Sequence, residues 1–297
     1  MRSHSPRSAF LLVTHGSRDP RPQLAATRLA RLVQAQLFHC DLHARKGLQP
    51  RVRLGDRLPV GALATVASGS VQSQVGNRVA EPVGLLERDD PCQSLPLVET
   101  AVLECGLLPL PAQIQQFAQV ARTAGCDRIQ LVPLFLLPGV HVMEDIPAAV
   151  QDAERLLRSP MQLHLRPYLG SHPLLFRLLG AQTDDPQAGF GRILLAHGSR
   201  RPGGNQPVAS MAARLQALPA FWFGGPDLRS QVEALIQQGC RQIAIHPYFL
   251  FAGGITDAIA QQVSHLRHPF PETQLHLEAP LATNPEIASL ITDLICS

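Results

Sequence analysis

The stretch Phe10-Leu-Leu-Val-Thr-His15-Gly-Ser-Arg18 recurs later in the chain as Ile193-Leu-Leu-Ala-His197-Gly-Ser-Arg200. The two histidines lie 182 positions apart. Each block is a short apolar run followed by histidine and glycine, which is typical of a buried strand that turns sharply into a helix. Such self-similarity indicates a fold built by repetition.

Three further blocks repeat in the same order, so we interpret the chain as a duplicated domain. The offset is 114 for two of the blocks and 112 for the third. We place the copies at residues 1–182 and 190–297, joined through a stretch rich in Gln, Asp, Pro and Gly. The repeated pairs are Gly125-Cys126 with Gly239-Cys240, Pro133-Leu-Phe-Leu with Pro247-Tyr-Phe-Leu, and Gln162-Leu-His-Leu165 with Gln274-Leu-His-Leu277.

The fall of the offset from 182 to 114 means that the first copy carries about 68 extra residues. We place most of them at about 36–96, where no helical or strand period is visible, and expect an irregular surface insertion. A substrate lid is the alternative. If the segment is dispensable, deletion of residues 44–91 leaves a folded, active protein.

Each copy alternates short apolar runs with segments of helical period. In the second copy we expect strands at 193–196, 221–223, 243–251 and 274–277, and in the first copy a strand at 132–137. This order predicts an α/β fold in which each copy is a small parallel sheet with helices on both faces.

Composition excludes several function classes. The chain has 297 residues, of which 45% are hydrophobic, and its 26 basic side chains exceed the acidic ones by only three, so we expect no nucleic-acid partner. Lys46 is the single lysine, which argues against Schiff-base and Walker-type phosphate sites. We find no membrane span or signal peptide, and the six cysteines are scattered. We therefore expect a cytoplasmic protein.

Three side chains are expected at the carboxyl ends of strands in the first copy, where ligands bind in such sheets. His15 follows the first strand, Glu104 follows a strand-like segment at 97–103, and His141 follows the strand at 132–137. Two imidazoles and a carboxylate suit a divalent transition metal. Glu144 and Asp145 could orient the ring of His141 or take a proton. The repetition of His15 as His197 is also compatible with a shared turn alone.

The second copy lacks two of these three groups. His141 corresponds to Ile255 or Gly253, depending on the offset, and only Trp222, Phe223 and Gly224 lie where an acid would match Glu104. We therefore place the active site in the first copy.

Four arginines follow the two repeated histidines: Arg18, Arg21, Arg200 and Arg201. Arginine binds carboxylates well. A metal site rimmed by arginines indicates a polycarboxylate chelator as substrate, although each arginine could also simply be solvated.

With these motifs, the chain resembles the class II tetrapyrrole chelatases. The resemblance rests on the His-Gly-Ser-Arg turns, on Val-Glu-Thr-Ala-Val-Leu-Glu at 98–104, and on Pro-Leu-Phe-Leu-Leu-Pro-Gly-Val-His at 133–141. The most similar group is the two-domain sirohydrochlorin cobaltochelatase and ferrochelatase family. It implies two flavodoxin-like domains facing a central cleft that binds the macrocycle.

Carried over to this chain, the resemblance implies that His15 and His141 bind the metal and act in catalysis, with Glu104 as an acidic ligand. We expect Ser17, Arg18, His197 and Arg200 to contact the substrate. The implied activity is insertion of Co²⁺ or Fe²⁺ into sirohydrochlorin, in cobalamin or siroheme biosynthesis, with no organic cofactor.

Two other classes share part of this pattern. A histidine phosphatase needs arginine directly before His-Gly, where this chain has Thr14 and Ala196, which argues against that class. A non-catalytic metal or tetrapyrrole carrier needs the same ligands as a chelatase and stays open. Because two fused copies resemble a dimer made covalent, we expect a monomer.

Overall fold

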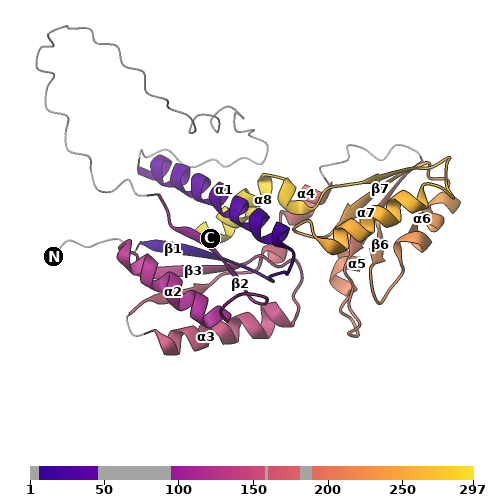
Figure 1. Ribbon diagram of the computed structural model, residues 1–297. Helices are drawn as coiled ribbons and strands as arrows, with labels where there is room; N and C mark the ends of the chain where they lie inside the picture. The colour runs from indigo at the N-terminus through magenta and orange to yellow at the C-terminus, as the bar shows by residue number, and fades with distance from the viewer. Residues whose placement is uncertain (1–6, 46–94, 158–159, 181–188) are drawn as a thin grey trace, which may run out of the picture.

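The computed structural model describes residues 7–45, 95–157, 160–180 and 189–297. Its two copies each hold one parallel four-stranded sheet, which confirms the predicted α/β class (Figure 1). The first copy runs β1 (Ser8–Thr14), α1 (Pro20–Arg45), β2 (Val98–Val102), α2 (Leu110–Thr123), β3 (Arg128–Pro133), the π-helical turn η1 (His141–Asp145), α3 (Ile146–Leu156), β4 (Gln162–Leu165), η2 (Leu169–Ser171) and α4 (Leu175–Gly180).

The second copy repeats this order without the π-helical turn. It runs β5 (Phe190–Ala196), α5 (Gln206–Arg214), β6 (Leu218–Phe221), α6 (Leu228–Gln237), β7 (Gln242–Pro247), α7 (Gly254–Leu266), β8 (Gln274–Leu277), η3 (Leu281–Thr283) and α8 (Glu286–Cys296). The strand orders, β2-β1-β3-β4 and β6-β5-β7-β8, are equivalent.

The alternation of side chains along β1 explains why helices cover both faces of the first sheet. Leu11 and Val13 face a core shared with α2 and α3, whereas Phe10 and Leu12 face a core shared with α1. All four are buried, and β1 is apolar from Ala9 to Val13, as a central parallel strand requires.

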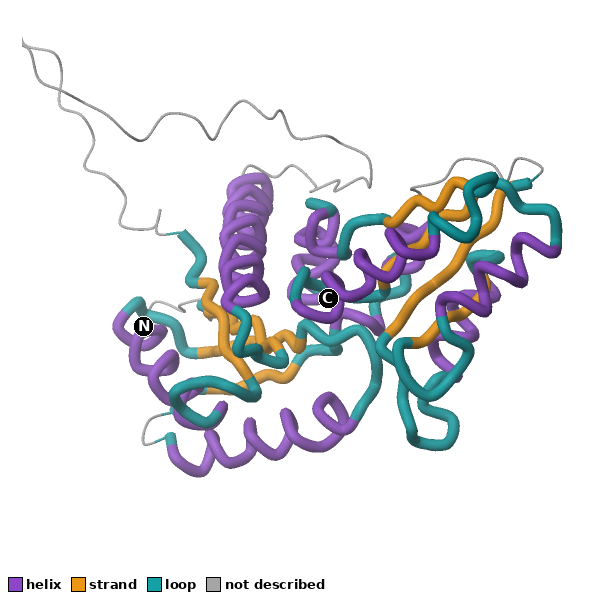
Figure 2. Tube along the Cα trace, turned by 45° about the vertical axis from the view of Figure 1, so that its right-hand side comes forward, coloured by secondary structure: helices purple, strands orange, loops and turns teal. Residues whose placement is uncertain are grey.

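The last helix of the chain packs on the first copy. Helix α8 lies beside α1 in both views (Figures 1 and 2). Gln36 of α1 donates a hydrogen bond to Ser289 and accepts one from Thr292, and Arg166, just after β4, donates to the carbonyl oxygen of Leu294. A helix from the second copy therefore helps α1 to cover one face of the first sheet.

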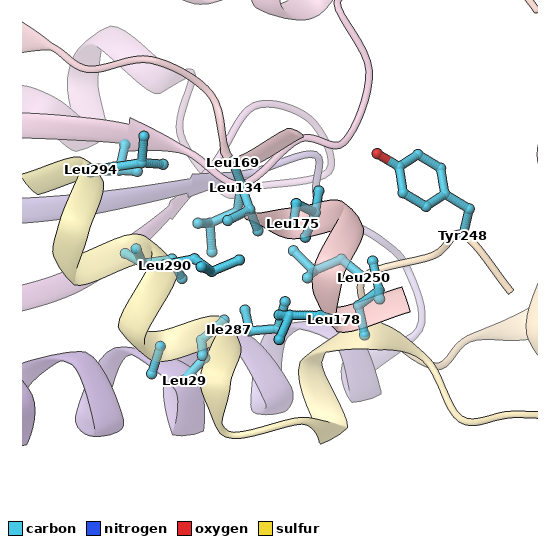
Figure 3. Packing of buried hydrophobic residues seen from close by; sticks show 14 of the residues in the cluster. Leu29, Leu134, Leu169, Leu175, Leu178, Tyr248, Leu250, Ile287, Leu290 and Leu294 are labelled. Carbon is cyan, nitrogen blue, oxygen red and sulfur yellow. The ribbon is translucent and has the colours of Figure 1, made fainter. Parts of the chain in front are cut away.

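The corresponding helix of the first copy, α4, lies between α8 and the second domain. Leu175 and Leu178 of α4 pack in one cluster with Ile287 and Leu290 of α8 (Figure 3). Beyond them, the guanidinium of Arg214 on α5 lies 4.2 Å from the centre of a phenylalanine ring on α4. One hydrophobic core thus runs through both copies and holds them together.

Helix α1 continues to Arg45, which corrects the expected start of the insertion at residue 36. Val33 and Leu37 are both buried and continue the apolar stripe, since they pack in the core that α8 closes. The sequence pattern up to residue 36 does not indicate that α8 packs against this part of the helix. Residues 46–94, which make up most of the expected insertion and of the proposed deletion, lie outside the described residues.

Two strands are displaced from their expected positions, and a third ends earlier. Strand β3 covers Arg128–Pro133 instead of 132–137, and β6 covers 218–221 instead of 221–223. Strand β7 ends at Pro247, whereas the expected strand extended to Phe251. The apolar residues after β3 leave the sheet to contact the other copy: the Tyr248 hydroxyl donates to the carbonyl oxygen of Leu136. The apolar residues after β3 are therefore explained by the interface between the copies and not by a longer strand.

The carboxyl ends of the two sheets meet at this interface. The turn before α7 lies against the start of α1, since a Cβ at Gly253 would approach Pro22 at 3.7 Å and Asp19 at 3.9 Å.

Among the helices that the structure describes, none is long and apolar enough to cross a membrane.

Candidate metal centre

The structure brings His15, Glu104 and His141 together, with one ligand atom of each lying within 4.8 Å of the others. Nε2 of His15 lies 3.9 Å from one carboxylate oxygen of Glu104, and Nε2 of His141 lies 4.0 Å from the other. The three residues follow β1, β2 and β3, which are neighbours in the sheet order. Parallel pairing therefore places them at one edge.

A close backbone approach fixes His15 relative to Glu104. The amide of Glu104 donates a 2.8 Å hydrogen bond to the carbonyl of His15. Gly16 follows with a φ of 93°, and a Cβ at this position would lie 1.9 Å from the carbonyl oxygen of Glu104. Only glycine fits there, because a side chain would push the two metal-ligand candidates apart.

The imidazole rings are oriented by acceptors behind them. Nδ1 of His15 lies 3.1 Å from the carbonyl oxygen of Gly16, and Nδ1 of His141 lies 2.7 Å from Oδ2 of Asp145. A carbonyl or carboxylate oxygen only accepts, so each Nδ1 carries the proton. In the neutral form of each ring, Nε2 is then the nitrogen without a proton, and it lies on the side of Glu104, as metal-ligating histidines require. The expectation that Glu144 or Asp145 orients His141 is met by Asp145.

The π-helical turn η1 places His141 and Asp145 on one face, one turn apart. Such turns often occur at functional sites. At the equivalent place in the second copy, α7 begins without a π-helical turn. The Gly253 amide donates a hydrogen bond to the Thr256 hydroxyl at the start of this helix.

Sequence reasoning missed Phe135, which packs beside both histidines. Its ring centre lies 6.3 Å from that of His15 and 6.1 Å from that of His141, and the two imidazoles meet edge to face at 4.9 Å. A signal was present, since Phe135 and Phe249 belong to one of the repeated blocks. The ring limits the positions that the imidazoles can take.

The three side chains are accessible to an incoming ion. His15 is 54% exposed, Glu104 51% and His141 34%. Transition-metal bonds of about 2.0–2.2 Å place neighbouring ligand atoms roughly 3–3.6 Å apart, so small rotations would close the observed separations. The set of two imidazoles and one carboxylate can hold a divalent ion and leave further coordination positions for a substrate.

The second copy has the same turn but lacks the counterparts of Glu104 and His141. Nδ1 of His197 lies 3.1 Å from the carbonyl oxygen of Gly198, as in the first copy. The amide that donates to the carbonyl of His197 is that of Phe223, which therefore occupies the position of Glu104. Among the described residues, the first copy alone forms a group of three metal-ligand side chains.

The expected rim residues have different environments. The Ser17 hydroxyl accepts a hydrogen bond from the Asp19 amide and stabilises the turn before α1. Arg18, His197 and Arg200 are exposed at the carboxyl ends of the first strand of each copy. Ser17 and Arg18 follow His15, and Arg200 follows His197; contact of these four residues with the substrate stays a prediction.

Arg21 is not a free rim residue. Its guanidinium binds Asp19, with a closest contact of 2.6 Å, and also binds Asp257 of α7 through contacts of 2.6 and 3.1 Å. These hydrogen bonds lower the pKa of both carboxyl groups. Arg21 therefore joins the two copies and has no free face for a carboxylate substrate.

Comparison with known proteins is consistent with this arrangement. Two proteins of Priestia megaterium are similar in sequence: a sirohydrochlorin cobaltochelatase is 22% identical over 212 residues, which is 66% of this chain and 68% of that protein. A sirohydrochlorin ferrochelatase is 24% identical over 206 residues, which is 64% of this chain and 76% of that protein.

Solved structures share the fold. SirB from Bacillus subtilis with Fe³⁺ has a TM-score of 0.61 and 18% identity, covering 98% of this chain and 94% of SirB. The structure of CbiX, described as the terminal enzyme of siroheme biosynthesis in denitrifying bacteria, has a TM-score of 0.53 and 18% identity, covering 97% and 98%. A family model described as CbiX matches residues 62–185 and 191–297. Since the model covers most of both copies, the chain belongs to the CbiX family.

Proposed function

We propose that this protein is a sirohydrochlorin chelatase that inserts a divalent ion, Co²⁺ or Fe²⁺, as a step of cobalamin or siroheme biosynthesis. The observation that carries the proposal is the convergence of His15, Glu104 and His141 at one sheet edge. Membership of the CbiX family supports the same activity. Metal and macrocycle are both substrates, and the reaction needs no organic cofactor.

The ligand set accounts for delivery of the metal. With both rings neutral, the Nε2 atoms of His15 and His141 bind the ion together with Glu104, while Asp145 keeps the His141 ring in its orientation. Imidazole and carboxylate ligands accept Co²⁺ and Fe²⁺ alike. The choice of metal therefore depends on more than these three side chains.

Insertion requires two pyrrole protons to leave the macrocycle as the metal enters. As the ion passes from its ligands to the macrocycle, two of the freed groups, which are the two Nε2 atoms and the Glu104 carboxylate, accept the two protons at the edge of the first sheet. These groups are exposed, so the protons can pass on to water. The sirohydrochlorin lies between the two copies in this proposal, with its carboxylates near Ser17, Arg18, His197 and Arg200.

An anaerobic absorbance assay with sirohydrochlorin and either Co²⁺ or Fe²⁺ tests the proposal. The native protein should complete many turnovers, and His141→Ala should lose them because one of the three ligands is gone. His164→Ala is the matched control, since His164 is an exposed histidine of the same domain on β4. It should retain native activity.

Three outcomes distinguish the possibilities. Turnover lost in His141→Ala and kept in His164→Ala supports a chelatase that uses the first-copy site. Turnover unchanged in His141→Ala places the reaction elsewhere and contradicts the site. Tight binding of pigment or metal without turnover, for both metals, assigns the protein to the carriers.

A further inference from the structure

Glu104 is held less directly than the two histidines of the metal centre. Acceptor oxygens behind the rings orient His15 and His141. Among the described residues, no hydrogen bond reaches the Glu104 carboxylate, whose nearest polar partners are the two imidazoles at 3.9 and 4.0 Å. Its side chain is half exposed, so packing does not fix it either. The position of this ligand candidate therefore depends on the backbone that carries it.

That backbone is the loop at residues 103–109, between β2 and α2. Cys105 has a φ of 58°, which is uncommon for a residue other than glycine. The side chain of Leu107 is fully exposed, so it contributes no packing that would hold the loop. Since ordering a backbone costs conformational entropy at every residue, a loop of this kind needs an anchor to keep one conformation.

Gln113 of α2 supplies this anchor. Its Oε1 accepts a 3.0 Å hydrogen bond from the Val102 amide, and its Nε2 donates at 2.8 Å to the carbonyl oxygen of Val102. The same Nε2 donates at 2.8 Å to the carbonyl oxygen of Leu108. Both N–H groups and the acceptor of the side-chain amide are thus in use. One side chain ties the last residue of β2 to the far end of the loop, with Glu104 between them.

These three hydrogen bonds, which we call the Gln113 clamp, take the place of a neighbouring strand. Strand β2 is an outer strand of the first sheet, so one of its edges has no strand beside it. There Gln113 pairs with both backbone groups of Val102, as a further strand would. Gly106 lets the loop fold back onto the clamp, since a Cβ at this position would lie 2.7 Å from Cγ2 of Val102.

The two copies use the position of Gln113 differently. At the offset of 114, it corresponds to Asp227. The Asp227 side chain caps α6 by accepting a hydrogen bond from the Ser230 amide, whereas α2 begins before Gln113, at Leu110. The copy without an acid after its second strand therefore has an ordinary helix cap at this position. The copy with Glu104 has a side chain that holds the loop.

We infer that Gln113 is a positioning residue of the metal centre, which keeps the Glu104 carboxylate opposite the two Nε2 atoms. The inference rests on the metal centre of the proposed function. Gln113 makes no hydrogen bond to the three ligand candidates and acts through the backbone of the loop. Without the clamp, the loop takes several conformations, and metal affinity falls in proportion to the fraction that presents the carboxylate correctly.

Calorimetric titration of the full-length protein with Co²⁺ tests the inference through a double-mutant cycle. Gln113→Met removes the three hydrogen bonds and leaves the charge of the metal centre unchanged. It should weaken Co²⁺ binding about tenfold, as loss of a partner that orients a ligand does. In a Glu104→Ala background, the same substitution should change the affinity less than about twofold, because the ligand that the clamp positions is already absent.

The matched control is Gln115→Met on the same helix. The Gln115 side chain also donates a hydrogen bond to a backbone carbonyl, that of Leu156 at the end of α3, away from the loop. Its Co²⁺ affinity should be native. Urea denaturation of the metal-free proteins shows which variants are folded. If Gln113→Met does not fold, Gln113→Asn takes its place in the cycle: it keeps the amide with a shorter reach, and the same dependence on Glu104 is expected.

Native Co²⁺ affinity in the Gln113 variant would overturn the inference. An equal loss of affinity with and without Glu104, or an equal loss in Gln115→Met, would also overturn it, since Gln113 would then support only the fold. Absence of Co²⁺ binding by the native protein, or native affinity in Glu104→Ala, would remove the ligand and the inference with it.

Failure of the proposed function gives a different result. A protein that binds Co²⁺ but never completes a turnover with sirohydrochlorin is not a chelatase, and the cycle still decides the role of Gln113. Conversely, turnover by the native protein together with native Co²⁺ affinity in Gln113→Met leaves the chelatase intact and rejects the positioning role.

Discussion

Nδ1 of His141 lies 2.7 Å from Oδ2 of Asp145, one turn further along the same helical segment. The repeat counterpart of Asp145 is Asp257, which binds Arg21 of the other copy instead. Aspartates at equivalent positions thus have two tasks: the first orients a metal-ligand candidate, and the second joins the domains.

Replacement of Asp145 by asparagine should weaken metal binding at the first copy. An amide can leave the His141 ring with the wrong tautomer or orientation, and loss of such an orienting carboxylate typically costs 10–100-fold in metal affinity or activity. Calorimetric titration with Co²⁺ measures the effect. Asp152→Asn, which alters an exposed aspartate of α3 paired with Arg155, should leave the affinity within about twofold of native. Equal affinities in the two variants would contradict the role of Asp145.

Gly16→Ala should damage both stability and the metal site. The new Cβ would lie 1.9 Å from the carbonyl oxygen of Glu104, at a φ of 93°. We expect a loss of more than about 3 kcal/mol in the free energy of unfolding, or failure to fold, because the backbone around Glu104 must move. Gly125→Ala is the control, since Gly125 has a similar φ of 77° but open space around it. Urea denaturation should show a loss of only about 1 kcal/mol for the control.

His246→Val should stabilise the protein at mildly acidic pH. His246 is 3% exposed, and neither of its ring nitrogens has a hydrogen-bond partner among the described residues. Burial, reinforced by the charge of Arg192, lowers its pKa to about 4. His246 is therefore protonated below about pH 6.5 in the unfolded state but only below about pH 4 in the folded state. Stability falls through this window as the pH falls, by about 2 kcal/mol at pH 5.

Valine is the residue at the equivalent position of the first copy. Val132 pairs with Leu12 as His246 pairs with Leu194. Urea denaturation at pH 7.5 and pH 5 should therefore show a smaller loss of stability on acidification in His246→Val than in the native protein. The same loss in both proteins would mean that His246 titrates normally.

Arg21→Gln should make the protein less sensitive to strong acid. Hydrogen bonds from Arg21 hold the pKa values of Asp19 and Asp257 below their ordinary value of 3.8 in the folded state. The stabilisation is present above that pH and is lost as the pH falls through the lower, folded values. The variant, already lacking it, should lose less stability between pH 5 and pH 2. Arg155→Gln, which breaks an exposed pair within α3, is the control in a thermal-denaturation series.

Most of the candidate site could be predicted from the chain alone. His15, Glu104 and His141 follow apolar runs of strand length, and the carboxyl ends of parallel strands share one edge, so their convergence follows from local pattern and general topology. The repeated block that holds Phe135 marks the residue as part of the shared fold, but an apolar residue in an apolar run does not show that it lies beside the two histidines. The partners of Arg21 were not predictable, since Asp257 lies 236 residues away.

The predicted boundaries of helices and strands are wrong where the two copies contact each other. The extension of α1 to Arg45 and the early end of β3 both depend on residues of the second copy, through Gln36 with α8 and Leu136 with Tyr248. Local periodicity reports that a residue is buried, and does not report which element buries it.

The sequence by itself determined the duplication, the α/β class, the strands that carry the ligands, and the confinement of a complete ligand set to the first copy. Tertiary structure alone decided that α8 helps to cover one face of the first sheet, that Arg21 joins the copies, and that Phe223 occupies the place of Glu104. The physical reason is that strands and turns follow from short-range steric and hydrophobic pattern, whereas helix exchange and ion pairing between copies depend on contacts between residues far apart in the chain.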